Sequence, residues 1–84
     1  MKLYNIDQCG YCAMVRDVLN NLDLKYEKID VSWSFFDRKE VIKISGQHTV
    51  PVLVDGDKVF ADEHDIIEYL KRNYPKPNQQ QLKR

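Results

Sequence analysis

The sequence predicts an α/β fold in which four strands form one mixed sheet and three helices pack against it, in the order β-α-β-α-β-β-α. Short apolar runs alternate with stretches of helical periodicity, which is typical of α/β domains. The first strand, helix and strand require a parallel pair with a right-handed crossover, and an Asp–Gly pair at residues 55–56 indicates an antiparallel hairpin. We expect one domain over residues 1–74, followed by a polar tail over residues 75–84.

The first strand and the first helix are predicted from their apolar patterns. The apolar run Leu3–Ile6 predicts the strand. The helix carries apolar residues at the i, i+3, i+4 and i+7 spacing of an amphipathic helix, and Cys12 lies on the same stripe. These residues are Val15, Val18, Leu19 and Leu22. We expect the helix to end at Asn20–Asp23.

The second strand and the second helix follow. The segment Lys25–Val31 contains aromatic and β-branched residues and is expected to pair as a strand. Ser34 followed by Asp37 fits a capping pattern for a helix that continues through Ile44. Gly46 is well placed to end that helix in a left-handed conformation.

A hairpin is predicted next. The continuous apolar run Val50–Val54 is typical of a strand buried on both faces, in which Pro51 is tolerated because it stands at the beginning. Asp55–Gly56 then indicates a tight turn into a last strand, Lys58–Phe60.

The third helix is predicted from its cap and its apolar side. Asp62, with Asp65 three residues later, forms the N-terminal cap, and Pro75 and Pro77 follow the end of the helix. The side expected to be buried consists of Ile66, Ile67, Leu70 and Tyr74.

The composition restricts the partners. Thirteen basic and thirteen acidic residues cancel, so no net charge attracts nucleic acid or an anionic membrane. No apolar run approaches the roughly 20 residues of a transmembrane helix. Two cysteines and an N-terminus without the pattern of a signal peptide indicate a cytoplasmic protein rather than a disulfide-stapled secreted one. We expect a monomer.

A C-x-x-C motif, Cys9–Cys12, stands between the first strand and the first helix. A helix N-terminus carries about half a positive charge and several unpaired amides, which favour a thiolate at Cys9. Cys12 falls behind it on the buried stripe. Such a motif indicates redox chemistry or metal binding. Zinc would require His48 and His64, whose separation does not match the spacing of zinc fingers, so we expect no metal site.

The chain resembles the glutaredoxin family, whose members have the thioredoxin fold. The likeness covers residues 1–74, and its most specific segments are Cys9–Cys12, Ser45–Gly46, Thr49–Pro51 and Val54–Gly56. The resemblance implies a cis peptide bond between Val50 and Pro51. It also implies that the backbone of Val50 is open beside Cys9, so that a substrate cysteine can pair with it like a short added strand.

Part of the chain also resembles the N-terminal domain of glutathione transferases, which has the same fold. The segments concerned are Val52–Val59, Asp62–Glu63 and Asp65–Leu70. Those enzymes normally continue into a helical second domain, which this chain is expected to lack.

The resemblance implies a dithiol mechanism. Cys9 is the nucleophile that attacks a mixed or protein disulfide, and Cys12 is the resolving thiol, because a two-residue spacer puts it about one helical turn behind Cys9. Cys12 or a second glutathione molecule then releases Cys9.

The resemblance also implies a glutathione site. Arg38 matches a basic position that holds the glycyl carboxylate, and Asp62 and Glu63 stand where the family binds the γ-glutamyl group. The remaining substrate-binding residues are expected to be Tyr11, Thr49, Val50 and Pro51. Tyr11 either packs against the ligand or covers the local core.

Three positions depart from the glutaredoxin pattern. Ile6 stands where many members have a lysine, and the nearby Asp7 opposes a thiolate. Phe60–Ala61 replaces a Gly–Gly pair and is expected to narrow the glutathione pocket. Gly10 replaces the usual proline, and small residues there accompany a glutathione-bridged iron–sulfur cluster between two chains in some relatives.

We therefore predict a dithiol oxidoreductase whose partners are disulfide-containing proteins and glutathione, the latter as reductant or substrate. Two alternatives stay open: a thioredoxin-like electron donor that takes electrons from a flavoprotein reductase, and a carrier of a [2Fe–2S] cluster. The aromatic residues Trp33, Phe35 and Phe36 form either a docking patch or part of the core and its rim.

Overall fold

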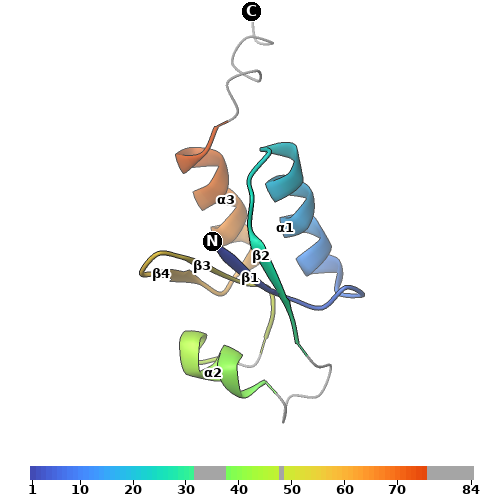
Figure 1. Cartoon of the computed structure of the whole chain (residues 1–84), viewed down its shortest axis with the longest axis vertical. Coiled ribbons are helices and arrows are strands. Elements are labelled where there is room, and N and C mark those ends of the chain that lie inside the picture. The colour runs from blue at the N-terminus through green and yellow to red at the C-terminus, as the bar shows by residue number, and fades with distance from the viewer. Residues whose placement is uncertain (32–37, 48, 76–84) are drawn as a thin grey trace, which may run out of the picture.

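The computed structural model describes residues 1–31, 38–47 and 49–75, and within them it has the predicted thioredoxin-like architecture (Figure 1). The elements are β1 (Lys2–Asn5), α1 (Gly10–Asn21), β2 (Glu27–Asp30), α2 (Lys39–Ser45), β3 (Val52–Asp55), β4 (Lys58–Phe60) and α3 (Glu63–Asn73). Their order confirms the β-α-β-α-β-β-α prediction, although β2 is shorter than the Lys25–Val31 segment.

The four described strands form one sheet in the order β2-β1-β3-β4. β1 runs parallel to β2, as the first crossover requires, and antiparallel to β3. β3 and β4 form the predicted hairpin, with Gly56 at a φ of 63° in its turn. β1 and β3 are therefore the central strands. The C-terminal end of β1 leads to the thiol motif, and Pro51 directly precedes the N-terminal end of β3; because the two strands are antiparallel, these ends lie at the same edge of the sheet.

Alternate residues of the central strands point to opposite faces of the sheet, and each face has its own core. Leu3 and Leu53 face each other across the β1–β3 pair and pack against α1 and α3. Tyr4 and Val52 form the next pair and pack with Val41 of α2. Figure 1 shows α1 and α3 side by side, with α2 on the other side of the sheet.

The C-terminal ends of α1 and α2 lie where the local sequence predicts them, whereas the start of α2 does not. α1 ends at Asn21, as predicted, and Asp23 follows with a left-handed φ of 57°. Gly46 ends α2 with a φ of 75°, which also confirms the prediction. α2 begins at Lys39 with Arg38 at its N-cap, four positions later than the predicted cap at Ser34, which like Asp37 lies outside the described residues.

α3 begins as predicted, because Oδ2 of Asp62 accepts a hydrogen bond of 3.2 Å from the amide of Asp65. The residues of its apolar side differ in burial. Ile66 and Leu70 are fully buried, whereas Ile67 and Tyr74 are partly buried at the edge of the same core. Pro75 follows directly, and the predicted tail beyond it lies outside the described residues.

Side-chain hydrogen bonds also fix α3 to the β3–β4 hairpin. The carboxylate of Asp55, at the end of β3, accepts hydrogen bonds from the hydroxyl of Tyr69, at 2.6 Å, and from that of Tyr74. The two hydroxyls hold the pKa of Asp55 below its usual range, and the carboxylate raises the pKa of both tyrosines. This contact sets the C-terminal half of α3 against the sheet and so helps to place its N-terminus.

No helix within the described segments is both long and apolar enough to cross a membrane.

Candidate active site

Cys9 is the N-cap of α1. Its backbone is extended, with φ −79° and ψ 122°, and its Sγ accepts a hydrogen bond of 3.4 Å from the amide of Cys12. Its own amide donates to the carbonyl of Ile6 at 3.0 Å, which closes the turn after β1. The sulfur of a half-buried residue therefore takes the place that a serine or aspartate oxygen usually has at a helix start, where negative charge is stabilised.

Cys12 has the opposite environment. Its side chain is fully buried, and both cysteines are free thiols. Burial raises the pKa of Cys12 to about 12, and the neighbouring Cys9 sulfur adds to the effect. Cys12 is therefore a protonated thiol near neutral pH, sheltered one helical turn behind an accessible sulfur.

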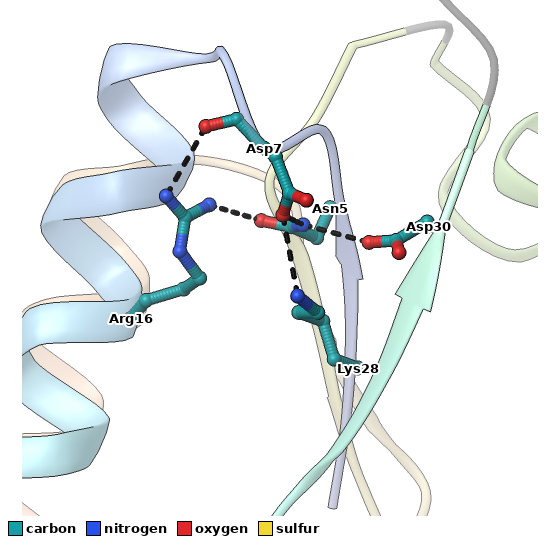
Figure 2. A network of polar contacts seen from close by, with 5 residues as sticks. All are labelled: Asn5, Asp7, Arg16, Lys28 and Asp30. Carbon is teal, nitrogen blue, oxygen red and sulfur yellow. Dashed lines mark hydrogen bonds and ion pairs between the residues drawn. The ribbon is translucent and has the colours of Figure 1, made fainter.

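The loop that carries Cys9 is held by a network of five polar residues (Figure 2). Lys28 lies 3.2 Å from Oδ1 of Asp7, which also accepts a hydrogen bond of 2.9 Å from Nδ2 of Asn5. These two contacts hold the pKa of Asp7 below its usual range. Lys28 therefore offsets the charge of Asp7, the acidic residue nearest in sequence to Cys9.

A groove opens beside the motif, at the end of the sheet where β3 begins and α3 starts. Its volume is about 420 Å³. The residues that line it are Tyr11, Gln47, Thr49, Val50, Ala61, Asp62, Glu63 and Asp65. They come from the first turn of α1, the segment before β3 and the start of α3, which are far apart in the sequence.

Five of the predicted substrate-binding residues meet in this groove: Tyr11, Thr49, Val50, Asp62 and Glu63. The peptide bond between Val50 and Pro51 is cis, as the resemblance implied; Pro51 is fully buried and does not line the groove. Tyr11 is 59% exposed, so its side chain is available to a ligand rather than serving as a lid on the core. Cys9 does not itself line the groove, but Tyr11 connects the two within one turn.

Arg38 is not where the prediction needed it. It is 5% exposed at the N-cap of α2, and it is not among the described residues that line the groove. The sequence shows a cationic residue near a helix start, but whether that residue is exposed depends on how α2 packs on the sheet. The expected contact between Arg38 and a glycyl carboxylate has no geometric support.

Two further groove residues, Gln47 and Asp65, were not predicted from the sequence, whereas Ala61 was expected at the pocket. Asp65 carried a signal, because it belongs to the cap of α3, and a residue in the first turn of a helix lies close to whatever the cap residue contacts. Gln47 carried none.

The expected narrowing by Phe60–Ala61 is limited to one methyl group. Phe60 points away from the groove and packs its ring on Tyr69, with 4.4 Å between ring centroids. Ala61 alone lines the groove. Having Phe60–Ala61 in place of a Gly–Gly pair therefore leaves the groove open.

The charge of the groove is one-sided. Three of its lining residues are acidic, Asp62, Glu63 and Asp65, and among its described lining residues there is no lysine or arginine. The N-terminus of α3, which forms part of the same wall, carries partial positive charge on its first-turn amides and so favours an anion. The groove is suited to a ligand that carries an ammonium group next to a carboxylate.

The motif also allowed metal binding. Within residues 1–31, 38–47 and 49–75, no group of three or more histidine, cysteine or acidic side chains is arranged to hold a metal ion. His64 is exposed on α3, while His48 and the aromatic residues Trp33, Phe35 and Phe36 lie outside the described residues.

Comparison with known proteins gives a consistent result. Residues 3–78 match the family described as glutathione S-transferase, N-terminal domain. Glutathione S-transferase Z1 of Arabidopsis thaliana is 39% identical over 79 residues, which cover 92% of this chain and 36% of that protein. The chain spans about a third of the length of the curated relatives it matches.

Solved structures agree. A bacterial maleyl pyruvate isomerase, described as a zeta-class glutathione S-transferase, superposes with a TM-score of 0.82 at 32% identity, over 92% of this chain and 37% of that one. A glutathione transferase homolog from Drosophila mojavensis, crystallised with bound glutathione, gives a TM-score of 0.83 at 38% identity, over 89% and 35% of the two chains.

Proposed function

Because the chain belongs to the glutathione S-transferase N-terminal domain family, we propose that it binds glutathione in the groove and uses Cys9 for thiol–disulfide exchange with it. The first part draws on the family and on the relative crystallised with glutathione. The second part draws on the thiol pair.

One observation carries the exchange chemistry. Cys9 is the N-cap of α1, its Sγ faces the amide of Cys12, and a groove for a peptide-like ligand begins two residues away at Tyr11. A thiol in this place is stabilised as a nucleophile by the helix N-terminus and remains half-exposed.

The proposed ligand pose follows from the chemistry of the groove. The γ-glutamyl end of glutathione carries one carboxylate and one ammonium group. The carboxylate meets the amides at the start of α3, and the ammonium meets Asp62 or Glu63. The cysteinyl backbone then pairs with Val50, and the ligand sulfur lies toward Cys9. Arg38 takes no part in this pose, because it is buried.

The reaction proceeds in two exchanges. The Cys9 thiolate attacks the glutathione sulfur of a mixed disulfide, a Cys9–glutathione bond forms, and the other thiolate leaves and takes up a proton. A second glutathione thiolate then attacks the bound glutathione sulfur, which yields oxidised glutathione and restores Cys9. On the alternative route Cys12 loses its proton, attacks Sγ of Cys9 and expels glutathione.

The raised pKa of Cys12 favours the route through a second glutathione near neutral pH. The Cys12 route needs a proton to leave a buried thiol. The dithiol reaction of glutaredoxins therefore remains a prediction, which the comparisons do not show, while the family supports the use of glutathione.

Binding tests the proposal without chemistry. S-methylglutathione cannot exchange its sulfur, so calorimetric titration of the reduced protein reports the groove alone. We expect saturable one-to-one binding that Glu63→Gln or Tyr11→Ala weakens by about tenfold, the effect of one lost polar or packing contact. The matched control is Val59→Ser on β4, an exposed apolar residue that does not line the groove. Absence of binding, or equal loss in the control, contradicts the proposal.

A thioredoxin-like electron donor remains the second candidate, and the acidic groove favours it, because glutathione has a net negative charge. Such a protein would reduce a protein disulfide with a flavoprotein reductase as electron source and would not bind S-methylglutathione.

The [2Fe–2S] carrier is the third candidate. Its cluster would lie between two chains, each supplying Cys9, with glutathione as the other thiolate ligand; Cys9 is accessible for this, but the family and the relatives that the chain matches give the cluster no support. Gly10 leaves open space beside the motif, but nothing in its surroundings points to a cluster.

A further inference from the structure

Arg16 extends from α1 to the loop that carries Cys9 (Figure 2). Nη1 donates a hydrogen bond to Oδ1 of Asn5, and Nη2 donates to the backbone carbonyl of Asp7 at 3.3 Å. One guanidinium group therefore joins the last residue of β1 to the loop backbone two residues before Cys9. None of these three residues lines the groove.

Asn5 is the centre of this contact. It is fully buried, and its Nδ2 donates to Asp7 and to Asp30 of β2, both at 2.9 Å. With Lys28 bound to Asp7, the loop is tied to α1, β1 and β2 at once. A buried asparagine whose amide is fully satisfied fixes geometry, because its donors and acceptor must all be met in one arrangement.

Arg16 also stands next to the resolving thiol. It follows Cys12 by four residues, so the two side chains lie on the same side of α1. The positive charge of Arg16 lowers the pKa of Cys12, against the larger effect of burial, which raises it. The same side chain thus contacts the Cys9 loop and acts electrostatically on Cys12.

We propose that Arg16 is a positioning residue for the second exchange, in which Cys12 attacks Sγ of Cys9. The inference rests on the proposed thiol chemistry but not on glutathione binding. Attack on a disulfide requires the entering, central and leaving sulfurs to lie in line, and Arg16 keeps the loop of Cys9 at a fixed place on α1.

The test uses 2,2′-dithiodipyridine, an uncharged disulfide, so the charge of Arg16 does not steer it. The Cys9 thiolate attacks the reagent, forms a Cys9–pyridyl disulfide and releases one thiopyridone. Cys12 then loses its proton to the buffer, attacks Sγ of Cys9, forms the Cys9–Cys12 disulfide and releases a second thiopyridone. Stopped-flow absorbance separates the two phases.

We expect Arg16→Met to leave the first phase within about threefold of the unmodified protein and to slow the second by about tenfold or more, since misplaced reacting groups cost at least that much. Arg16→Lys keeps the charge but reaches only one acceptor, so its second phase should be intermediate. If Arg16→Met does not fold, Arg16→Lys decides: a second phase as fast as in the unmodified protein overturns the proposal.

Arg16→Lys keeps the charge beside Cys12, and two further controls separate positioning from a change in net charge or in stability elsewhere in the fold. Arg72→Met removes an exposed arginine that pairs with Glu68 on α3, and Asp55→Asn weakens the contact between hairpin and α3. Both should keep a second phase of normal rate. A normal second phase in Arg16→Met, an equal slowing in either control, or release of only one thiopyridone by the unmodified protein overturns the proposal. Because glutathione is absent, these outcomes are distinct from a failure of glutathione binding.

Discussion

Cys9 and Cys12 are three residues apart, yet the fold gives their sulfurs opposite environments. Cys9 is half-exposed at a helix start, and its Sγ accepts a hydrogen bond from a backbone amide. Cys12 is fully buried, and its pKa is raised to about 12. The first is suited to attack and the second to stay protonated until a mixed disulfide forms in front of it. This division of roles is the basis of two predictions.

The first prediction concerns Cys12→Ser. Reduction of a glutathione mixed disulfide should retain most of its rate, because that route needs only Cys9 and free glutathione. Reduction of a protein disulfide should fall by about a hundredfold or more, since no second thiol is held at high effective concentration. Both rates are measured in a coupled reductase assay. Equal loss on the two substrates would contradict the glutathione route.

The second prediction concerns alkaline pH. Because the pKa of Cys12 is raised in the fold, the unfolded chain loses this proton first as the pH rises. The stability from the buried neutral thiol is therefore complete below pH 9 and is lost between pH 9 and about 12. The free energy of unfolding of Cys12→Ala, measured with urea at each pH, should decline less steeply over that range than that of the unmodified protein. Tyr4, whose pKa burial also raises to about 12, is present in both proteins and does not affect the comparison. Parallel declines would contradict the assignment.

At the scale of elements, the start of α3 has two tasks. Asp62 caps the helix by accepting the amide of Asp65, and the same turn forms one wall of the groove. A helix that frays here loses both stability and a binding surface, so the two properties should change together.

The third prediction follows from this coupling. Asp62→Ala should lower the free energy of unfolding by about 1 kcal/mol, the usual effect of losing an N-cap, and should also weaken binding of S-methylglutathione. The control is Asp57→Ala in the exposed hairpin turn, which should change either quantity little. Chemical denaturation and titration calorimetry give the two measurements. A loss of stability with unchanged affinity would remove Asp62 from the proposed site.

The fourth prediction concerns the tie between β3 and α3. Asp55→Asn replaces a carboxylate that accepts hydrogen bonds from two tyrosine hydroxyls. It should lower the free energy of unfolding by about 1 kcal/mol, a value that allows for the partial exposure of the Asp55 side chain. Because the pKa of Asp55 is lowered in the fold, its contribution is present above pH 3.8 and is lost as the pH falls further. The difference between the two proteins should therefore shrink in acid. A difference that does not depend on pH would show that the carboxylate charge is not involved.

At the scale of the molecule, features that depend on neighbouring residues were predictable. The order of elements, the Asp55–Gly56 turn, the Asp62 cap and the stop at Gly46 each follow from local chemistry at one place in the chain. The convergence of Tyr11, Thr49 and Glu63 in one groove required the family resemblance, because no local pattern connects those three segments.

Features set by packing between distant segments were not predictable. Arg38 was expected at the ligand and is buried, and Phe60 was expected to narrow the groove and instead packs on Tyr69. The contact of Arg16 with Asn5 depends on how α1 lies against β1, which periodicity alone does not specify. In each case the residue type was visible, but the direction of its side chain was not.

On our proposal, the glutathione groove and a reactive Cys9 belong to one site. The most direct measurement is the intact mass of Cys12→Ser after exposure to oxidised glutathione, followed by peptide mapping, with and without excess S-methylglutathione. We predict one glutathione per chain, on Cys9, at a rate that the thioether reduces because it occupies the groove. No adduct on Cys9, or an adduct whose rate the thioether leaves unchanged, would contradict the account.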